Sequence, residues 1–184
     1  MTTLVLIRHG ETDWNQIGRY QGQADPSMNE AGFTQARNLV TQISHIKLNI
    51  LYSSPLKRAL QTAQIVAQEL NLPLQTDSRL KEINQGVWQT QLHSEIQAEF
   101  PDQFRQWESH PWTITPPGGE SLPAVRKRID DFVDEVIQIN KGQVIGLVTH
   151  RIPIAIVKIR FQGLDPDIVR TIEISNTYWE AIEI

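Results

Sequence analysis

Cysteine is absent from this chain of 184 residues. Its absence excludes disulfide frameworks, zinc sites built on thiolates and cysteine nucleophiles. A basic excess is also absent, because the net charge is −4 and nucleic-acid-binding domains usually carry a basic surface. The apolar run near the N-terminus covers only residues 4–7, which is too short for a signal-peptide core or a membrane span. We therefore expect a cytoplasmic protein with no nucleic-acid and no membrane partner.

What the chain does have is an ordinary globular composition, with 40% hydrophobic and 21% charged residues. Its length fits one domain, since domains typically run to roughly 100–200 residues. We expect residues 1–184 to form a single domain that needs no disulfide or metal to hold its core together.

Short apolar runs alternate with segments of helical periodicity, which predicts an α/β fold with a mostly parallel sheet. Because such sheets carry helices on both faces, the expected architecture is a three-layer αβα sandwich. The predicted strands are residues 4–7, 50–52, 73–76, 144–148, 171–174 and 178–182. The predicted helices are residues 30–44, 55–70, 122–139 and 154–161.

Residues 84–119 do not fit this alternation. The segment holds three of the five tryptophans, and Pro101 would break any single helix through it. We interpret it as a small helical and aromatic insertion packed over one edge of the sheet, where it could cover an active site. Its aromatic residues could equally form a satellite core, and the two interpretations are compatible.

Arg8, His9 and Gly10 follow the first predicted strand. Neighbouring side chains of a strand point to opposite faces, so Arg8 and His9 can serve one site only if the chain turns. Gly10 permits a turn because glycine tolerates positive φ. Ligands of open α/β sheets bind at the carboxyl ends of the strands, which is where this cation and imidazole lie.

A second cluster of cations begins the helix predicted at residues 55–70. Ser54 is a good N-cap and Pro55 would then be the first helical residue. Lys57 and Arg58 fall in the first turn, where the helix dipole disfavours cations. They are favourable there if an anion binds beside them and the free amides, although both could simply extend into water.

His150 follows the strand predicted at residues 144–148, so two strands each end in a histidine. Together with Arg8 and Arg58, His9 and His150 indicate a cationic pocket suited to a transferring phosphoryl group. Glu82 could protonate a leaving oxygen there, but the pattern alone does not select it from the other carboxylates.

These residues belong to a longer pattern that resembles the signature of the histidine phosphatase superfamily, the phosphoglycerate-mutase-like fold. Six blocks match in order along almost the whole chain. They are Arg8–Thr12 with Trp14 and Asn15, Arg19–Gly22 with Asp25 and residues 29–32, residues 53–63, residues 80–82 with Gly86 and Trp88, residues 117–121, and Thr149 with His150.

The resemblance implies a role for each matching residue. His9 would be the nucleophile and become phosphohistidine, and Glu82 would be the general acid and then the base. Arg8, Arg58 and His150 would bind the phosphoryl oxygens, and Asn15, Gln21 and Gly22 would contact phosphate or substrate. It also implies no metal and no organic cofactor. His9 must be neutral to attack, whereas His150 would act better charged, so we expect opposite protonation states.

Three positions depart from the family pattern. Arg151 stands where relatives usually have glycine, Gln89 and Thr90 replace a usual Glu-Gly pair, and Met28 replaces a usual leucine. Arg151 could crowd the pocket, supply a cation for a second anionic group of the substrate, or point away.

The leading hypothesis is a phosphatase that acts on a small phosphorylated metabolite. The alternatives are a phosphoglycerate mutase that depends on 2,3-bisphosphoglycerate, and a catalytically inactive binding module of the same fold. A mutase needs extra cations for the substrate's carboxylate, and Arg105 is the only arginine or lysine between Glu82 and Glu120. We therefore expect hydrolysis to exceed isomerisation. A homodimer is compatible with this sequence.

Overall fold

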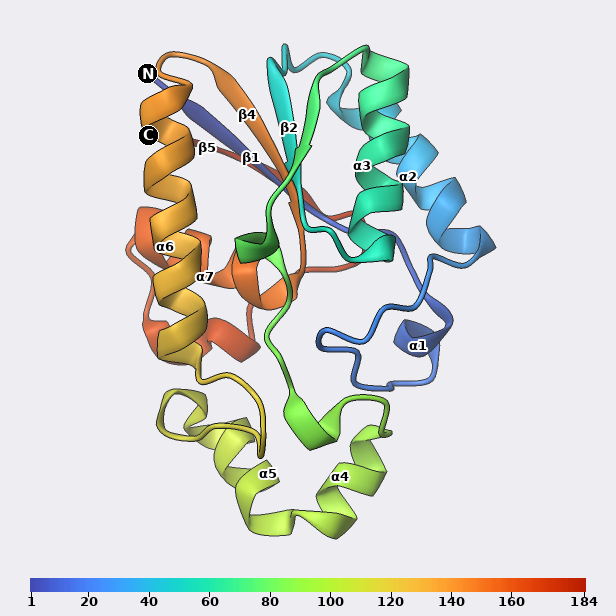
Figure 1. Ribbon diagram of the computed structural model, residues 1–184, viewed down its shortest axis with the longest axis vertical. Coiled ribbons are helices and arrows are strands. Elements are labelled where there is room, and N and C mark those ends of the chain that lie inside the picture. Colours follow the sequence, from blue (N-terminus) through green and yellow to red (C-terminus); the bar gives the residue numbers. More distant parts are fainter.

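The computed structural model describes residues 1–184 and is built on one five-stranded sheet in the order β3-β2-β4-β1-β5 (Figure 1). The strands are β1 (Thr3–Arg8), β2 (Ile50–Ser53), β3 (Leu74–Thr76), β4 (Val144–Thr149) and β5 (Trp179–Glu183). β1 to β4 pair in parallel, and only β5 runs antiparallel, against β1. The mostly parallel sheet is therefore confirmed.

The strand predicted at residues 171–174 is wrong. The N–H groups of Thr171 and Ile172 both donate to the carbonyl of Ile168, at 2.8 and 3.0 Å, so this segment continues the turn of the 3₁₀ helix η4 (Pro166–Arg170). Residues 171–174 pair with none of the five strands, and the Ile174 carbonyl instead accepts from Arg8 Nη1 at 2.6 Å.

Helices cover both faces of the sheet, as the sequence predicts. Along β1, Leu4 and Leu6 pack into one hydrophobic cluster with α6 (Leu122–Ile139) and α7 (Arg151–Gln162). Val5 and Ile7 point to the other face and pack with α2 (Glu30–Ile43) and α3 (Lys57–Leu70). Alternate residues of one strand thus serve two cores, which explains why the run is apolar throughout. None of the helices has the length and apolar character needed to cross a bilayer.

Two helices begin at residues other than those predicted. α3 begins at Lys57 rather than at Pro55, and its N-terminus is capped from outside, because the Lys57 N–H donates to Asp25 Oδ1 at 2.6 Å. An anion does lie at this helix terminus, but it is a carboxylate of the protein. α7 begins three residues early, at Arg151, which places that side chain in the first turn.

The insertion consists of α4 (His93–Glu99) and α5 (Pro101–Ser109) with two 3₁₀ turns, η2 (Gly86–Trp88) and η3 (Pro111–Thr113). Pro101 separates the two helices, as predicted. The helices lie beyond the carboxyl ends of the parallel strands rather than over one edge of the sheet (Figure 1). Trp88 and Trp107 are fully buried in the same cluster as Leu6. The aromatic residues therefore extend the main core and do not form a satellite.

We predict that the insertion and the sheet unfold as one unit. Trp88→Ala should lower the free energy of unfolding by about 3–5 kcal/mol, because it removes a buried aromatic side chain from the shared core. The measurement is urea denaturation followed by far-UV circular dichroism and by tryptophan fluorescence.

The control is Val87→Ala, whose side chain is 48% exposed and should change the stability by less than about 0.5 kcal/mol. A tryptophan fluorescence transition at a lower urea concentration than the circular-dichroism transition would contradict a shared core.

Candidate active site

Two histidines emerge side by side because two parallel strands end together. β1 and β4 pair in a register that sets Arg8 opposite Thr149, and the His9 N–H donates to the Thr149 carbonyl at 3.1 Å. The next residue on each strand is a histidine. The His9 and His150 ring centroids are 5.1 Å apart. The structure thus brings both predicted histidines to the carboxyl end of the sheet.

His9 presents one ring nitrogen to the cavity. Its Nδ1 lies 2.7 Å from the carbonyl oxygen of Gly10, which can only accept, so Nδ1 carries the proton and Nε2 keeps its lone pair. Burial, followed by the charges of Arg58 and Arg8, holds the pKa of His9 well below its usual range. A neutral imidazole with a free Nε2 has the form of a nucleophile.

Gly10 is required for a different reason from the one predicted, since its φ is not positive. A Cβ at this position would lie 2.6 Å from the Gly32 carbonyl oxygen and 2.6 Å from Met28 Sδ. Glycine therefore allows the turn after His9 to pack directly against the start of α2. Met28 is buried, which agrees with a packing role.

His150 lies beside His9 and is fully buried, and it is not among the residues that line the cavity. Its Nε2 is 2.8 Å from Ser54 Oγ, and its Nδ1 has no hydrogen-bond partner. Ser54 thus contacts His150 instead of capping α3. Burial and the Arg58 charge also lower the pKa of His150 well below its usual range. The pKa values of both histidines are thus lowered, which favours two neutral imidazoles, and a charged His150 beside a bound anion stays a prediction.

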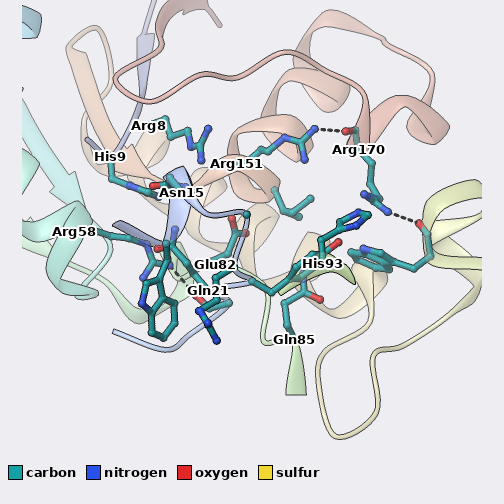
Figure 2. Close-up of a pocket in the computed structure, with 17 residues that line it drawn as sticks. Arg8, His9, Asn15, Gln21, Arg58, Glu82, Gln85, His93, Arg151 and Arg170 are labelled. Atoms are coloured by element: carbon teal, nitrogen blue, oxygen red, sulfur yellow. Dashed lines mark hydrogen bonds between the residues drawn. The ribbon is translucent and has the colours of Figure 1, made fainter. Parts of the chain in front are cut away.

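Two arginines flank His9 at the same end of the cavity (Figure 2). Arg58 is 1% exposed, and its Nη atoms donate to the carbonyls of Ala24 and Gly22, each at 2.8 Å. Arg8 Nη1 donates to the Ile174 carbonyl at 2.6 Å. Burial lowers the pKa of each to about 10, so both remain charged at neutral pH. In both side chains the buried Nε has no acceptor in the protein.

Glu82 lies near the middle of the cavity in Figure 2, between the His9 end and the far end. Burial raises the pKa of the Glu82 carboxyl group. The Ile83 N–H, which donates to Oε1 at 2.9 Å, and the charges of Arg58 and Arg8 oppose this rise only in part. A carboxyl group with a raised pKa can act as a proton donor near neutral pH.

The backbone that carries Glu82 is held by an arginine the sequence analysis did not single out. Arg128 donates to the carbonyls of Lys81 and Glu82, at 2.7 and 3.1 Å, and pairs with Glu120 at 3.0 Å. Glu120 Oε2 also accepts from the Asn84 N–H at 2.8 Å. These contacts fix the segment on both sides of Glu82.

The remaining predicted site residues also line the cavity, which has a volume of about 440 Å³. Asn15 Oδ1 accepts from the Thr12 N–H at 3.0 Å, which leaves its Nδ2 as a donor. Gly22 has φ +49°, and the carbonyl of this turn binds Arg58. Gln89 Oε1 accepts from the Gln23 N–H at 2.6 Å and so braces the loop that carries Gln21 and Gly22.

The cavity wall also includes residues to which the sequence assigned no role. They are Trp14, Gly18, Arg19, Tyr20, Gln85, His93, Trp107, Ile152 and Arg170. Arg151 points into the cavity, and its guanidinium donates to the carbonyl of Arg170 (Figure 2). The expected shortage of cations outside the phosphoryl site is therefore wrong. Arg105 is the only arginine or lysine between Glu82 and Glu120, but Arg170 lies outside that range, in η4, 88 residues after Glu82 in the chain. No group of three or more His, Cys, Asp or Glu side chains comes together as a metal site.

A family model described as the histidine phosphatase superfamily (branch 1) matches residues 4–184. Phosphoserine phosphatase 1 of Hydrogenobacter thermophilus is 38% identical over 90% of this chain and 78% of its own length. Adenosylcobalamin/alpha-ribazole phosphatase of Escherichia coli (strain K12) is 29% identical over 98% of this chain and 89% of its own length.

Solved structures of relatives share the whole fold. YhfR of Bacillus stearothermophilus superposes with a TM-score of 0.93 at 31% identity, covering 100% of this chain and 92% of that one. The mycobacterial glucosyl-3-phosphoglycerate phosphatase in complex with VO3 gives a TM-score of 0.88 at 30% identity, covering 97% and 91%. These findings confirm the resemblance, the fold and the phosphatase class predicted from the sequence. The chain belongs to the histidine phosphatase superfamily, branch 1.

Proposed function

We propose that this protein hydrolyses a small phosphate monoester through a phosphohistidine intermediate on His9. One observation carries the proposal. Two guanidinium groups, those of Arg8 and Arg58, line the cavity beside His9, and the buried Nε of each has no acceptor in the protein. Buried donors are almost always paired in proteins, and the oxygens of a phosphoryl group would supply acceptors for both guanidinium groups.

Ser54 determines what His150 can offer to that group. The Ser54 hydroxyl already accepts from the Leu56 N–H at 3.3 Å, so its own proton can be donated to His150 Nε2. The neutral ring then carries its proton on Nδ1, so that the buried His150 has a free donor beside His9. A phosphoryl oxygen that reaches this donor would not require a charged imidazole.

In the first step, the lone pair of His9 Nε2 forms a bond to phosphorus while the bond from phosphorus to the ester oxygen breaks. The carboxyl group of Glu82 gives its proton to that oxygen, so the product leaves as an alcohol and Glu82 becomes a carboxylate. The Gly10 carbonyl, which accepts from Nδ1–H, stabilises the positive charge that develops on the ring.

In the second step, the Glu82 carboxylate takes a proton from water as the water oxygen attacks phosphorus. The bond from phosphorus to Nε2 breaks, inorganic phosphate leaves, and His9 is neutral again. Arg8 and Arg58 stabilise the charge on the phosphoryl oxygens in both steps, since both are fixed by carbonyl contacts and stay protonated.

The named activities of the relatives support this reaction class. Phosphoserine phosphatase 1 and the alpha-ribazole phosphatase act, by name, on phosphorylated small molecules. The mycobacterial relative has been solved with VO3 and with inorganic phosphate. The cytoplasmic location and the homodimer stay predictions, which fractionation of cells and sedimentation equilibrium would test.

The first prediction concerns the nucleophile. His9→Ala should lower kcat for p-nitrophenyl phosphate by at least about 10³-fold, because the covalent route is lost. Its circular dichroism spectrum should match that of the parent, since His9 lies after the end of a strand. His45→Ala is the control, because His45 is exposed and remote from the cavity. Turnover within tenfold of the parent would rule out His9 as the nucleophile.

A second prediction concerns the acid. Glu82→Gln should slow an alkyl phosphate by about 10²–10⁴-fold, because its alkoxide must be protonated to leave, and should slow p-nitrophenyl phosphate far less. Glu82 donates only while protonated, so the kcat/KM of the parent for the alkyl ester should fall as pH rises through the raised pKa. This fall should be missing in the variant. Equal losses for both esters would show that Glu82 is not the acid.

A third prediction concerns metals. The charges of Arg8 and Arg58 beside His9 and Glu82 would repel a cation, so we propose that the reaction uses no metal. Dialysis against EDTA should leave kcat unchanged. Activity that is lost on dialysis and returns with a divalent ion would refute the proposal.

A further inference from the structure

The cavity carries more fixed positive charge than one phosphoryl group needs. Arg8 and Arg58 lie at the end that holds His9, whereas Arg151 and Arg170 lie at the other end (Figure 2). Glu82 is the only aspartate or glutamate among the residues that line the cavity. The two far arginines therefore need an explanation of their own.

Arg151 is an unfavourable residue for its position unless an anion lies nearby. It occupies the first turn of α7, where the helix dipole disfavours a cation, and it forms no salt bridge with any carboxylate. Burial and the neighbouring charge of Arg170 lower its pKa. Its guanidinium is held in place only by the carbonyl of Arg170.

Arg170 is fixed more tightly than Arg151. Its Nη1 donates to the Trp107 carbonyl at 3.0 Å, its guanidinium lies 5.3 Å from the Trp107 ring centroid, and it pairs with Glu108. Glu108 thus pairs with Arg170, whereas Arg151 has no carboxylate partner in the protein. A guanidinium group without a counter-ion beside one that is held in place suits a carboxylate, which can accept paired hydrogen bonds from its planar fork.

We propose that Arg151 and Arg170 form a subsite for a carboxylate on the alcohol part of the substrate, which makes the substrates small phosphorylated carboxylic acids. The inference rests on the proposed function, because it places the phosphoryl group at His9 and the carboxylate at the other end of the same cavity. Guanidinium groups bind carboxylates through paired, directional hydrogen bonds, so this subsite would select as well as attract.

The test compares substrates that differ only in the charged group. Phosphate release is measured from O-phosphoserine against O-phosphoethanolamine, and from 3-phosphoglycerate against glycerol 3-phosphate. The parent should favour the carboxylate member of each pair by about 10–100-fold in kcat/KM, the size expected for charge-assisted hydrogen bonds. Arg151→Gln should reduce that ratio to within about threefold of unity.

Two further variants complete the design. Arg170→Lys keeps the positive charge, so the fold should be preserved, but it loses the paired hydrogen bonds of a guanidinium group. It should also lower the kcat/KM ratio between the carboxylate substrate and its partner. Arg105→Gln removes an exposed arginine of the insertion that does not line the cavity, and should leave the ratio unchanged.

The outcomes separate this inference from the proposed function. If the parent hydrolyses p-nitrophenyl phosphate and shows the same kcat/KM for the two members of each pair, the proposed phosphatase activity is supported and the carboxylate subsite is refuted. The parent could instead prefer propane-1,3-diol bisphosphate over propyl phosphate and show no preference for the carboxylate substrates. If Arg151→Gln abolished that preference, the carboxylate assignment would be refuted. Conversion of 3-phosphoglycerate to 2-phosphoglycerate faster than phosphate release, in the presence of 2,3-bisphosphoglycerate, would overturn the phosphatase itself.

Discussion

The parallel pairing of β1 with β4 is the constraint on which the rest of the site depends. Their register ends both strands at the same level, so that His9 and His150 follow as neighbours with ring centroids 5.1 Å apart. Arg58, from the start of α3, and Glu82, from the segment after β3, then reach the same edge of the sheet. A slip of one residue would turn one of the histidines to the opposite face.

Burial determines the charge state of this edge. It lowers the pKa of both histidines and both arginines, and it raises that of Glu82. The arginines start from so high a pKa that they stay charged, whereas the histidines become neutral. The same low-polarity surroundings therefore favour a neutral imidazole, a protonated carboxyl group and two charged guanidinium groups, which is the combination that the proposed phosphoryl transfer requires.

Much of the site could be predicted because short motifs hold its residues. Arg8 ends β1, and His9 and His150 directly follow β1 and β4, whose apolar runs are plain in the sequence; α6 was predicted with its observed bounds. What failed depends on contacts between distant segments. Ser54 contacts His150, and Asp25 caps α3 in its place.

Arg170 could not be found from local pattern, because its place in the cavity depends on Trp107 in the insertion and on the start of α7. The extra strand predicted at residues 171–174 failed for a related reason, since the backbone of this segment contacts η4 and the distant Arg8 instead of another strand. Strand-end residues are thus readable from sequence, whereas the walls that select a substrate come from the assembled fold.

The covalent intermediate offers the most direct test of this account. Rapid quench of the protein with ³²P-labelled substrate, followed by peptide mapping at alkaline pH, would locate the label. We expect one acid-labile, base-stable phosphoryl group per chain on the peptide that contains His9, and none on the His150 peptide. Full turnover with no trapped label at any time, or label on another residue, would contradict the central role of His9.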